Sequence, residues 1–138
     1  QVELHPFLQQ QDLVDYCQSN NMLVTSYSPL GSGDRPARLK LEREPIPLKH
    51  PVIKSIAEKH HSTTGQVLIA WALARGTSVI PKSSNPNRLK ENFEAQKLEL
   101  DSDDLEAIAK MDKHYRFIHG EFWCPEGSSY TLENLWDE

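Results

Sequence analysis

The alternation of short apolar segments with amphipathic helical patterns constrains this 138-residue chain more than any other feature. The apolar segments lie at residues 2–4, 22–27 and 79–80. Helical spacing of apolar residues is found at residues 12–19, from residue 51, at 64–74, from residue 86 and after residue 102. Strands separated by helices in this order are typical of an α/β protein with a parallel sheet.

The segment 78–92 carries the clearest chemical signal in the chain. Its apolar run predicts a short strand that ends in a proline, so that Lys82 lies at the carboxyl end of the strand. Asn85 followed by Pro86 predicts the start of a helix, with the asparagine as its cap. Because Arg88 falls in the first helical turn, these residues together predict an anion site. The alternative is a solvated helix start whose cations offset nearby carboxylates.

Four blocks of the sequence resemble the aldo-keto reductase family, in the order that the family has them. They lie at residues 2–6, 26–32, 66–76 and 80–93. The last block contains K-S-x-x-P-x-R-x-x-E-N, which is similar to the family's segment for the 2′-phosphate and adenosine of NADP. The resemblance implies a (β/α)₈ TIM barrel. A complete barrel takes about 250 residues, so we expect the carboxyl-terminal half, strands 6–8 with their helices at 1–113 and a tail at 114–138.

The resemblance also implies that this chain supplies most of an NADP(H) site. Gln1 would lie at the nicotinamide carboxamide and Tyr27 would stack on the nicotinamide ring, with Ser28, Leu30 and Ser32 beside the pyrophosphate. The 2′-phosphate would be held by Lys82, Ser83 and Arg88, with Asp34 tied to Lys82, and the adenine by Glu91 and Asn92. Ser84 is also expected to bind the cofactor. A flat ring is stabilised by stacking on a phenol, and a phosphate dianion is held well by Arg and Lys at a helix amino end. Two cations favour NADP over NAD.

The implied activity is the NADPH-dependent reduction of aldehydes and ketones to alcohols by hydride transfer. The family's catalytic tyrosine, lysine, aspartate and histidine come from the first half of the barrel, so we assign no catalytic residue in this chain and expect the chain alone to be inactive. One alternative is a non-catalytic NADP-binding sensor or regulatory subunit of the same family. Another is an unrelated barrel that binds a phosphorylated metabolite. A doubly wound fold is less favoured because the sequence has no G-x-G-x-x-G motif.

Composition and charge restrict the possible partners. A net charge of −5 without a basic stripe argues against nucleic acid, and the chain has no apolar run long enough to cross a bilayer. Cys17 and Cys124 lack metal-site spacing and fit a reducing cytoplasm. We read His60 and His61 as surface residues and expect no metal. The expected partners are a small carbonyl substrate and the amino-terminal half of the barrel, within a monomer.

Two irregular segments have open interpretations. The polar loop at residues 31–50 is long enough to be a lid or a disordered segment. Beyond residue 113 the chain is rich in aromatic residues and has no periodicity. This tail packs on the barrel exterior, or its residues Phe122, Trp123 and Cys124 form a wall of a substrate pocket.

Local signals predict the helix starts and the core. Thr63 and Gln66 have the spacing of a capping box, Ser102 is placed to cap the last helix, and Trp71 is expected in the core. Three strands of an eight-stranded barrel have two open edges. We therefore expect the strand residues to meet water or another chain; they are Val2, Leu4, Val24, Val79 and Ile80.

Overall fold

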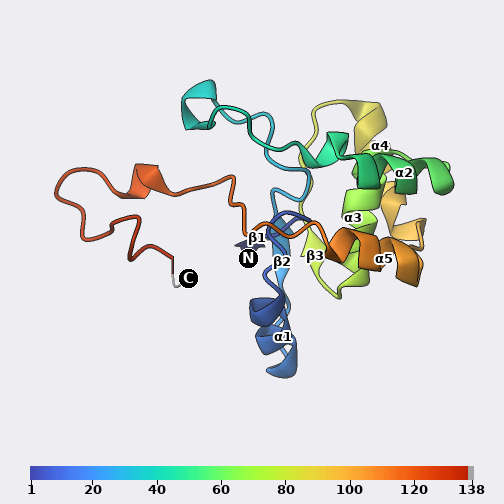
Figure 1. Ribbon diagram of the computed structural model, residues 1–138, viewed down its shortest axis with the longest axis horizontal. Helices are drawn as coiled ribbons and strands as arrows, with labels where there is room; N and C mark the ends of the chain where they lie inside the picture. Colours follow the sequence, from blue (N-terminus) through green and yellow to red (C-terminus); the bar gives the residue numbers. More distant parts are fainter. Residues whose placement is uncertain (137–138) are drawn as a thin grey trace.

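The computed structural model describes residues 1–136 and has a three-stranded parallel sheet at its centre (Figure 1). The strands are β1 (Val2–Glu3), β2 (Thr25–Tyr27) and β3 (Ser78–Val79), in the order β1-β2-β3. Ser26 of β2 lies opposite Val2 on one side and Val79 on the other. The predicted α/β class with parallel strands is therefore confirmed.

Five α-helices connect and cover these strands. They are α1 (Gln11–Ser19), α2 (Pro51–Lys59), α3 (Thr64–Ala74), α4 (Pro86–Glu94) and α5 (Ser102–Ala109). In Figure 1 the helices α2 to α5 gather to one side of the sheet, whereas α1 lies below it. The strands thus share a direction, and the segments that follow them leave the sheet at the same edge.

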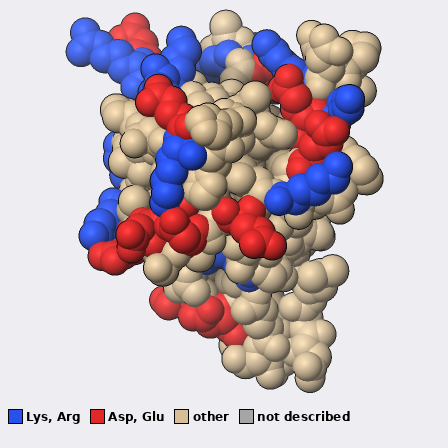
Figure 2. Space-filling view, turned by 90° about the vertical axis from the view of Figure 1, so that its right-hand side faces the viewer, with Lys and Arg blue, Asp and Glu red and all other residues tan. Residues whose placement is uncertain are grey.

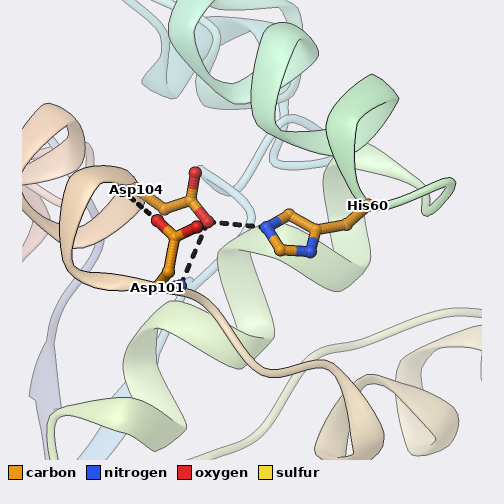
Figure 3. A group of neighbouring side chains, drawn as sticks. All are labelled: His60, Asp101 and Asp104. Atoms are coloured by element: carbon orange, nitrogen blue, oxygen red, sulfur yellow. Dashed lines mark hydrogen bonds and ion pairs between the residues drawn. The ribbon is translucent and has the colours of Figure 1, made fainter.

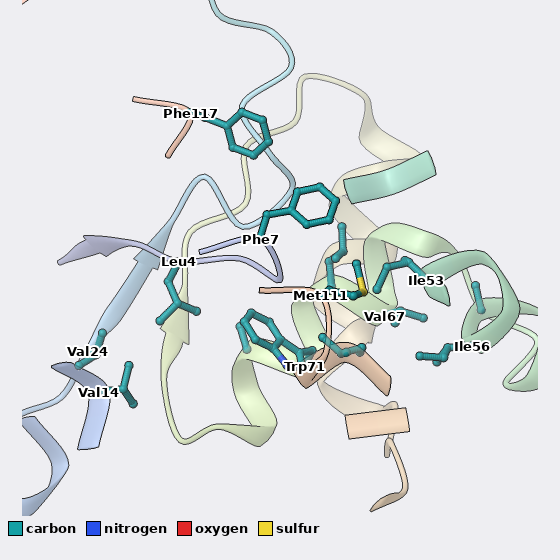
Figure 4. Packing of buried hydrophobic residues seen from close by; sticks show 14 residues of the cluster. Leu4, Phe7, Val14, Val24, Ile53, Ile56, Val67, Trp71, Met111 and Phe117 are labelled. Atoms are coloured by element: carbon teal, nitrogen blue, oxygen red, sulfur yellow. The ribbon is translucent and has the colours of Figure 1, made fainter. Parts of the chain in front are cut away.

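Helix α3 is the centre of the hydrophobic core, because it is buried around most of its circumference. Its residues Val67 to Ala72 are all buried, and Trp71 is 2% exposed. Figure 4 shows Trp71 and Val67 facing Ile53 of α2 and Phe7 from the turn after β1. The prediction that Trp71 lies in the core is confirmed.

The sheet residues are better covered than the sequence suggested. Leu4 and Val24, which we expected at an exposed surface, are 0% and 5% exposed, so this part of the prediction is wrong. They pack in one cluster with Val14 of α1 and Trp71 of α3. The helices on the sheet bury these residues without the rest of a barrel. Ile80 is 50% exposed, as expected.

Side chains cap three of the helices. The Thr63 hydroxyl accepts a hydrogen bond from the Gln66 backbone amide, and the Gln66 side chain accepts one from the Thr63 backbone amide. This reciprocal pair confirms the predicted capping box of α3. Asn85 caps α4 as predicted. The cap of α5 is Asp101 and not Ser102, since Asp101 has the extended backbone and forms a reciprocal box with Asp104.

The long loop and the tail complete the described chain. The loop 31–50 contains two 3₁₀ turns, η1 (Ala37–Leu39) and η2 (Pro47–Lys49). The tail contains a third, η4 (Glu121–Trp123), and in Figure 1 it extends from the sheet on the side away from α2 to α5. A fourth 3₁₀ turn, η3 (Ala95–Lys97), follows α4. Among the described residues, no helix has the length and apolar character needed to span a bilayer.

Candidate functional site

A cavity of about 1020 Å³ lies at the edge of the sheet where the strands end. The turn after β2, the loop 31–50, the segment after β3 and the first turns of α4 form its walls. Since two strands point toward one edge of a parallel sheet, the polar residues that follow them meet there. The cavity therefore joins segments that are more than 40 residues apart in the sequence.

Most of the predicted cofactor-binding residues border this one cavity. Those that do are Ser28, Leu30, Ser32, Asp34, Lys82, Ser83, Ser84, Arg88, Glu91 and Asn92. Gln1 and Tyr27 do not line it, and Gln1 is exposed. The geometry thus brings together the residues assigned to the phosphates and the adenine. Their binding roles stay predictions, as do those of Gln1 and Tyr27 at the nicotinamide.

The amino end of α4 presents its cap and a free cation to the cavity. Asn85 Oδ1 accepts from the backbone amides of Asn87 (2.9 Å) and Arg88 (3.2 Å). The Ser83 hydroxyl accepts from the Asn85 amide at 3.1 Å. Within residues 1–136 the Arg88 guanidinium has no partner, so it can bind an anion without first breaking a bond in the protein.

An ion pair joins the loop to the segment after β3. Lys82 Nζ donates to Asp34 Oδ2 at 2.7 Å. The hydrogen bond from Lys82 lowers the pKa of Asp34 below its usual value, against a small opposing effect of burial. Both side chains are largely exposed, so the pair contributes at most about 1 kcal/mol. It crosses the mouth of the cavity from one wall to the other.

Asn92 offers an unused donor in the cavity wall. Its Nδ2 atom is buried and has no hydrogen-bond partner among the described residues. The neighbouring Glu91 carbonyl accepts from the Gln66 side chain at 3.2 Å, which fixes this turn of α4 against α3. A buried donor without a partner is costly. The cations, hydroxyls and amide that line the cavity are of the kinds that the phosphates and base of a nucleotide require.

The first strand ends in a buried ion pair that holds the tail. Glu3 Oε1 lies 2.9 Å from His5 Nε2 and accepts from the Phe117 amide at 2.6 Å, while Oε2 accepts from the Ile118 amide at 2.9 Å. Burial raises the pKa of Glu3, but the bonds from His5 and the two amides outweigh this effect and leave the pKa below its usual value. His5 is fully buried and does not line the cavity.

Tyr27 lies beside Glu3 on the neighbouring strand. Its carbonyl accepts from the Leu4 amide at 3.3 Å, and its side chain is half-buried. Burial and the negative charge of Glu3 raise the pKa of the Tyr27 phenol. The raised pKa keeps the phenol neutral at physiological pH.

The tail contributes Phe117 to the cavity wall, a residue that the sequence did not identify. Phe117 packs 4.7 Å from the His5 ring and lies beneath the Arg35 guanidinium of the loop. The predicted pocket residues lie elsewhere: Phe122 and Trp123 are 53% and 59% exposed, and Cys124 is half-buried. None of the three borders the cavity, and their assignment to a substrate pocket stays a prediction.

Other cavity residues could have been found only from the three-dimensional structure. Lys40, Arg43 and Ile46 of the loop and Thr63 at the start of α3 also line the cavity. The loop has no periodicity, so the sequence gives no indication of which of its side chains turn inward. Its excess of basic over acidic residues was the one available signal.

A second polar cluster lies outside the cavity, where the end of α2 meets the start of α5 (Figure 3). His60 Nε2 lies 2.6 Å from Asp104 Oδ2, so our prediction that His60 is a surface residue is wrong; His61 is exposed. His60, Asp101 and Asp104 have ligand atoms close enough for a metal ion. However, Lys59 Nζ already contacts Asp101 at 2.5 Å and Asp104 at 2.9 Å. The cluster is thus an ion-pair network.

Charges of both signs are mixed on the helical side of the molecule. Figure 2 shows Lys and Arg side chains next to Asp and Glu over the right-hand side of the view in Figure 1, with uncharged surface between them. No extended patch of one sign appears on this face.

Comparison with known proteins gives a consistent result. A sequence model described as the aldo/keto reductase family matches residues 1–113. The chain is 53% identical to an aldo/keto reductase of Synechocystis over 138 residues. It is 42% identical to aldo-keto reductase family 1 member A1 of Bos taurus over 118 residues, and 43% identical to a probable NAD(P)H-dependent D-xylose reductase of Aspergillus clavatus over 119 residues.

These matches cover most of this chain but a smaller part of each relative. They include 100%, 86% and 85% of the chain, respectively, and 42%, 36% and 36% of the relatives. The chain thus spans about two fifths of the length of the curated relatives that it matches. The resemblance that the sequence motifs indicated is confirmed by these comparisons.

Proposed function

The chain belongs to the aldo/keto reductase family, and from that premise we propose that it supplies most of the NADP-binding site of an NADPH-dependent carbonyl reductase. In this proposal it forms the carboxyl-terminal half of a (β/α)₈ barrel, with barrel residues at 1–113 and a tail at 114–138. In this proposal, the complete enzyme contains these residues and has the length of the relatives. We call this complete enzyme the longer protein. Its substrate is a small aldehyde or ketone.

The observation that carries this proposal is the single cavity shared by two distant segments. The turn after β2 and the start of α4 both border it, and they carry the residues assigned to the pyrophosphate and to the adenosine 2′-phosphate. An extended dinucleotide needs such a continuous site with hydroxyls, cations and free amides along it. A small phosphorylated metabolite would leave the Asn92 end of the cavity unused.

In the proposed mechanism, the residues of this chain bind and orient the cofactor. Arg88 and Lys82 neutralise the 2′-phosphate at the amino end of α4. Ser28 and Ser32 donate hydroxyl hydrogen bonds to the pyrophosphate, and Asn92 donates to the adenine. The bound NADPH supplies the hydride for carbonyl reduction. The proton donor to the carbonyl oxygen comes from the part of the longer protein outside this chain.

The proposal favours NADPH over NADH. Only NADPH has the 2′-phosphate that Arg88 and Lys82 would neutralise, and the xylose reductase relatives are named as NAD(P)H-dependent. Because Arg88 has no partner in the described chain, its charge is available for the phosphate. We therefore expect nucleotide preference to depend on this side chain.

Substitution of Arg88→Ala in the longer protein tests the proposal. We expect NADPH binding to weaken by about 1.5–3 kcal/mol, the range for hydrogen bonds to charged groups, while NADH binding stays nearly unchanged. Fluorescence titration with both nucleotides measures the two dissociation constants. Lys90→Ala is the matched control, since Lys90 is an exposed cation of the same helix that does not line the cavity. An equal loss for NADPH and NADH would contradict the assignment.

A further inference from the structure

Four cationic side chains border the cavity, and they differ in whether the protein already uses them. Lys40 and Arg43 come from the loop, and Lys82 and Arg88 from the opposite wall. Lys82 binds Asp34, and Lys40 Nζ donates to the Gly33 carbonyl at 2.5 Å. Over the described residues, the side chains of Arg43 and Arg88 have no hydrogen-bond or ion-pair partner. Two unpaired guanidinium groups, one from the loop and one from α4, thus line one cavity.

The loop does not need Arg43 for its own conformation, because Arg35 has that role. Arg35 Nε donates to the Leu39 carbonyl at 3.0 Å and Nη1 donates to the Ser32 carbonyl at 3.1 Å. Its Nη2 atom pairs with the Glu44 carboxylate. These bonds connect the beginning, middle and end of the loop.

Of the two acidic residues next to Arg43 in the sequence, Glu42 makes no ion pair with it among the described residues, and Glu44 is occupied elsewhere. Glu44 Oε1 accepts from Arg35 and from the Leu41 amide at 2.8 Å. It therefore does not neutralise the guanidinium next to it in the sequence. The charge of Arg43 remains available to a ligand in the cavity.

The backbone at Arg43 supports a role in binding. Its φ of 59° lies in the left-handed region, which glycine adopts without strain and an arginine adopts at a cost. Residues held in this region are concentrated at ligand clamps and similar functional sites.

We propose that Arg43 is a phosphate-binding residue of the loop, which adds a second guanidinium to the cofactor's phosphate groups across the cavity from Arg88. The inference rests on the proposed function. The planar guanidinium matches phosphate oxygens in a bidentate geometry. Both arginines line the cavity that the proposed function assigns to the dinucleotide.

Arg43→Ala in the longer protein tests this role, with Arg38→Ala as the matched control. Arg38 is an exposed arginine of the same loop that does not line the cavity. We expect Arg43→Ala to weaken NADPH binding about 3- to 30-fold, the effect of one charged contact partly screened by solvent. Arg38→Ala should change it by no more than about twofold. Titrations with NADPH and NADH measure both effects.

The pattern of loss identifies the phosphate. A loss for NADPH alone assigns Arg43 to the 2′-phosphate, and an equal loss for NADPH and NADH assigns it to the pyrophosphate. An Arg43→Ala effect no larger than that of Arg38→Ala overturns the inference while leaving the proposed function intact. If the unaltered longer protein binds neither nucleotide, both proposals fail.

A second variant separates binding from folding. Arg43→Gly removes the side chain and also relieves the left-handed backbone, so it should melt at the same temperature as the unaltered protein or higher. We expect it to lose NADPH affinity as Arg43→Ala does. A variant that keeps full affinity would show that the arginine is not a ligand.

Discussion

Gly31 sets the point at which the loop leaves the sheet. Its φ is +89°, and a Cβ atom added there would lie 2.6 Å from Cδ and 2.9 Å from Cγ of Pro47. The two ends of the loop therefore touch because this residue has no side chain. A Cβ atom added at Gly33, two residues later, would lie in open space.

Gly31→Ala should destabilise the longer protein by about 1–3 kcal/mol, because the new methyl group clashes with a proline ring and the backbone is left-handed. Urea unfolding measures the change in the free energy of unfolding. Gly33→Ala is the control and should be nearly neutral. Equal effects of the two substitutions would show that the contact between Gly31 and Pro47 does not constrain the loop.

Glu3 shows how one buried carboxylate can fix a distant segment. Through Phe117 and Ile118 it ties the start of the tail to the end of β1. Phe117 in turn supports Arg35 of the loop, with the guanidinium 5.4 Å from the ring centre. The first strand, the loop and the tail thus meet around Glu3 and Phe117.

At the scale of elements, the ion-pair network in Figure 3 connects α2 to α5. Asp104 is buried, with its side chain 4% exposed, and accepts from Lys59, His60 and the Asp101 amide. Burial raises the pKa of Asp104, but the bonds from Lys59, His60 and the Asp101 backbone lower it below its usual value. The ionised carboxylate therefore stabilises the contact between the helices.

Asp104→Asn should lower the free energy of unfolding of the longer protein by about 1–3 kcal/mol at pH 7, since an amide donor replaces an oxygen that faces the Asp101 N–H. A folded pKa below the unfolded value gives stability that is present above about pH 4 and is lost as the pH falls through the folded pKa. The difference between the variant and the unaltered protein should accordingly shrink below pH 4.

Urea unfolding at pH 7 and at pH 3 checks this dependence. Asp103→Asn is the control, because Asp103 is an exposed aspartate in the same helical turn. A loss that is the same at both pH values would mean that the charge of Asp104 does not stabilise the helix contact.

At the scale of the whole molecule, apolar side chains remain exposed on α1, the segment before β2, α4 and the tail. Leu23 is 75% exposed, Phe93 72%, Tyr16 64% and Trp123 59%. Within the described chain, β1 and β3 are each paired on one side only. Open edges and apolar surface of this kind favour association with another chain.

We expect the isolated 138-residue chain to self-associate and to be a poor catalyst. Size-exclusion chromatography with light scattering measures the association, and NADPH oxidation with a reactive aldehyde measures the activity. Without a general acid for the carbonyl oxygen, the rate should be lower by about 10²–10⁴-fold. A monomer that melts cooperatively and has ordinary turnover would contradict this expectation.

Local sequence determined the parts of this protein that depend on neighbouring residues. The Asn85-Pro86 helix start, the Thr63–Gln66 capping box and the buried face of α3 all follow from spacings within one helical turn. The motif around Lys82 and Arg88 likewise indicated the family, and it is the basis of the predicted phosphate site. Where two residues compete for one local role, as Asp101 and Ser102 do, the sequence alone gave the wrong cap.

Only the tertiary structure decided which distant residues meet. Burial of Leu4 and Val24 depends on helices that are remote in the sequence, and the contact of Glu3 with Phe117 spans 114 residues. Whether His60 reaches Asp104, and which loop arginine faces the cavity, depend on chain packing rather than on periodicity. Loops and strand ends have no repeating pattern to read, because their conformations are set by the elements that they touch.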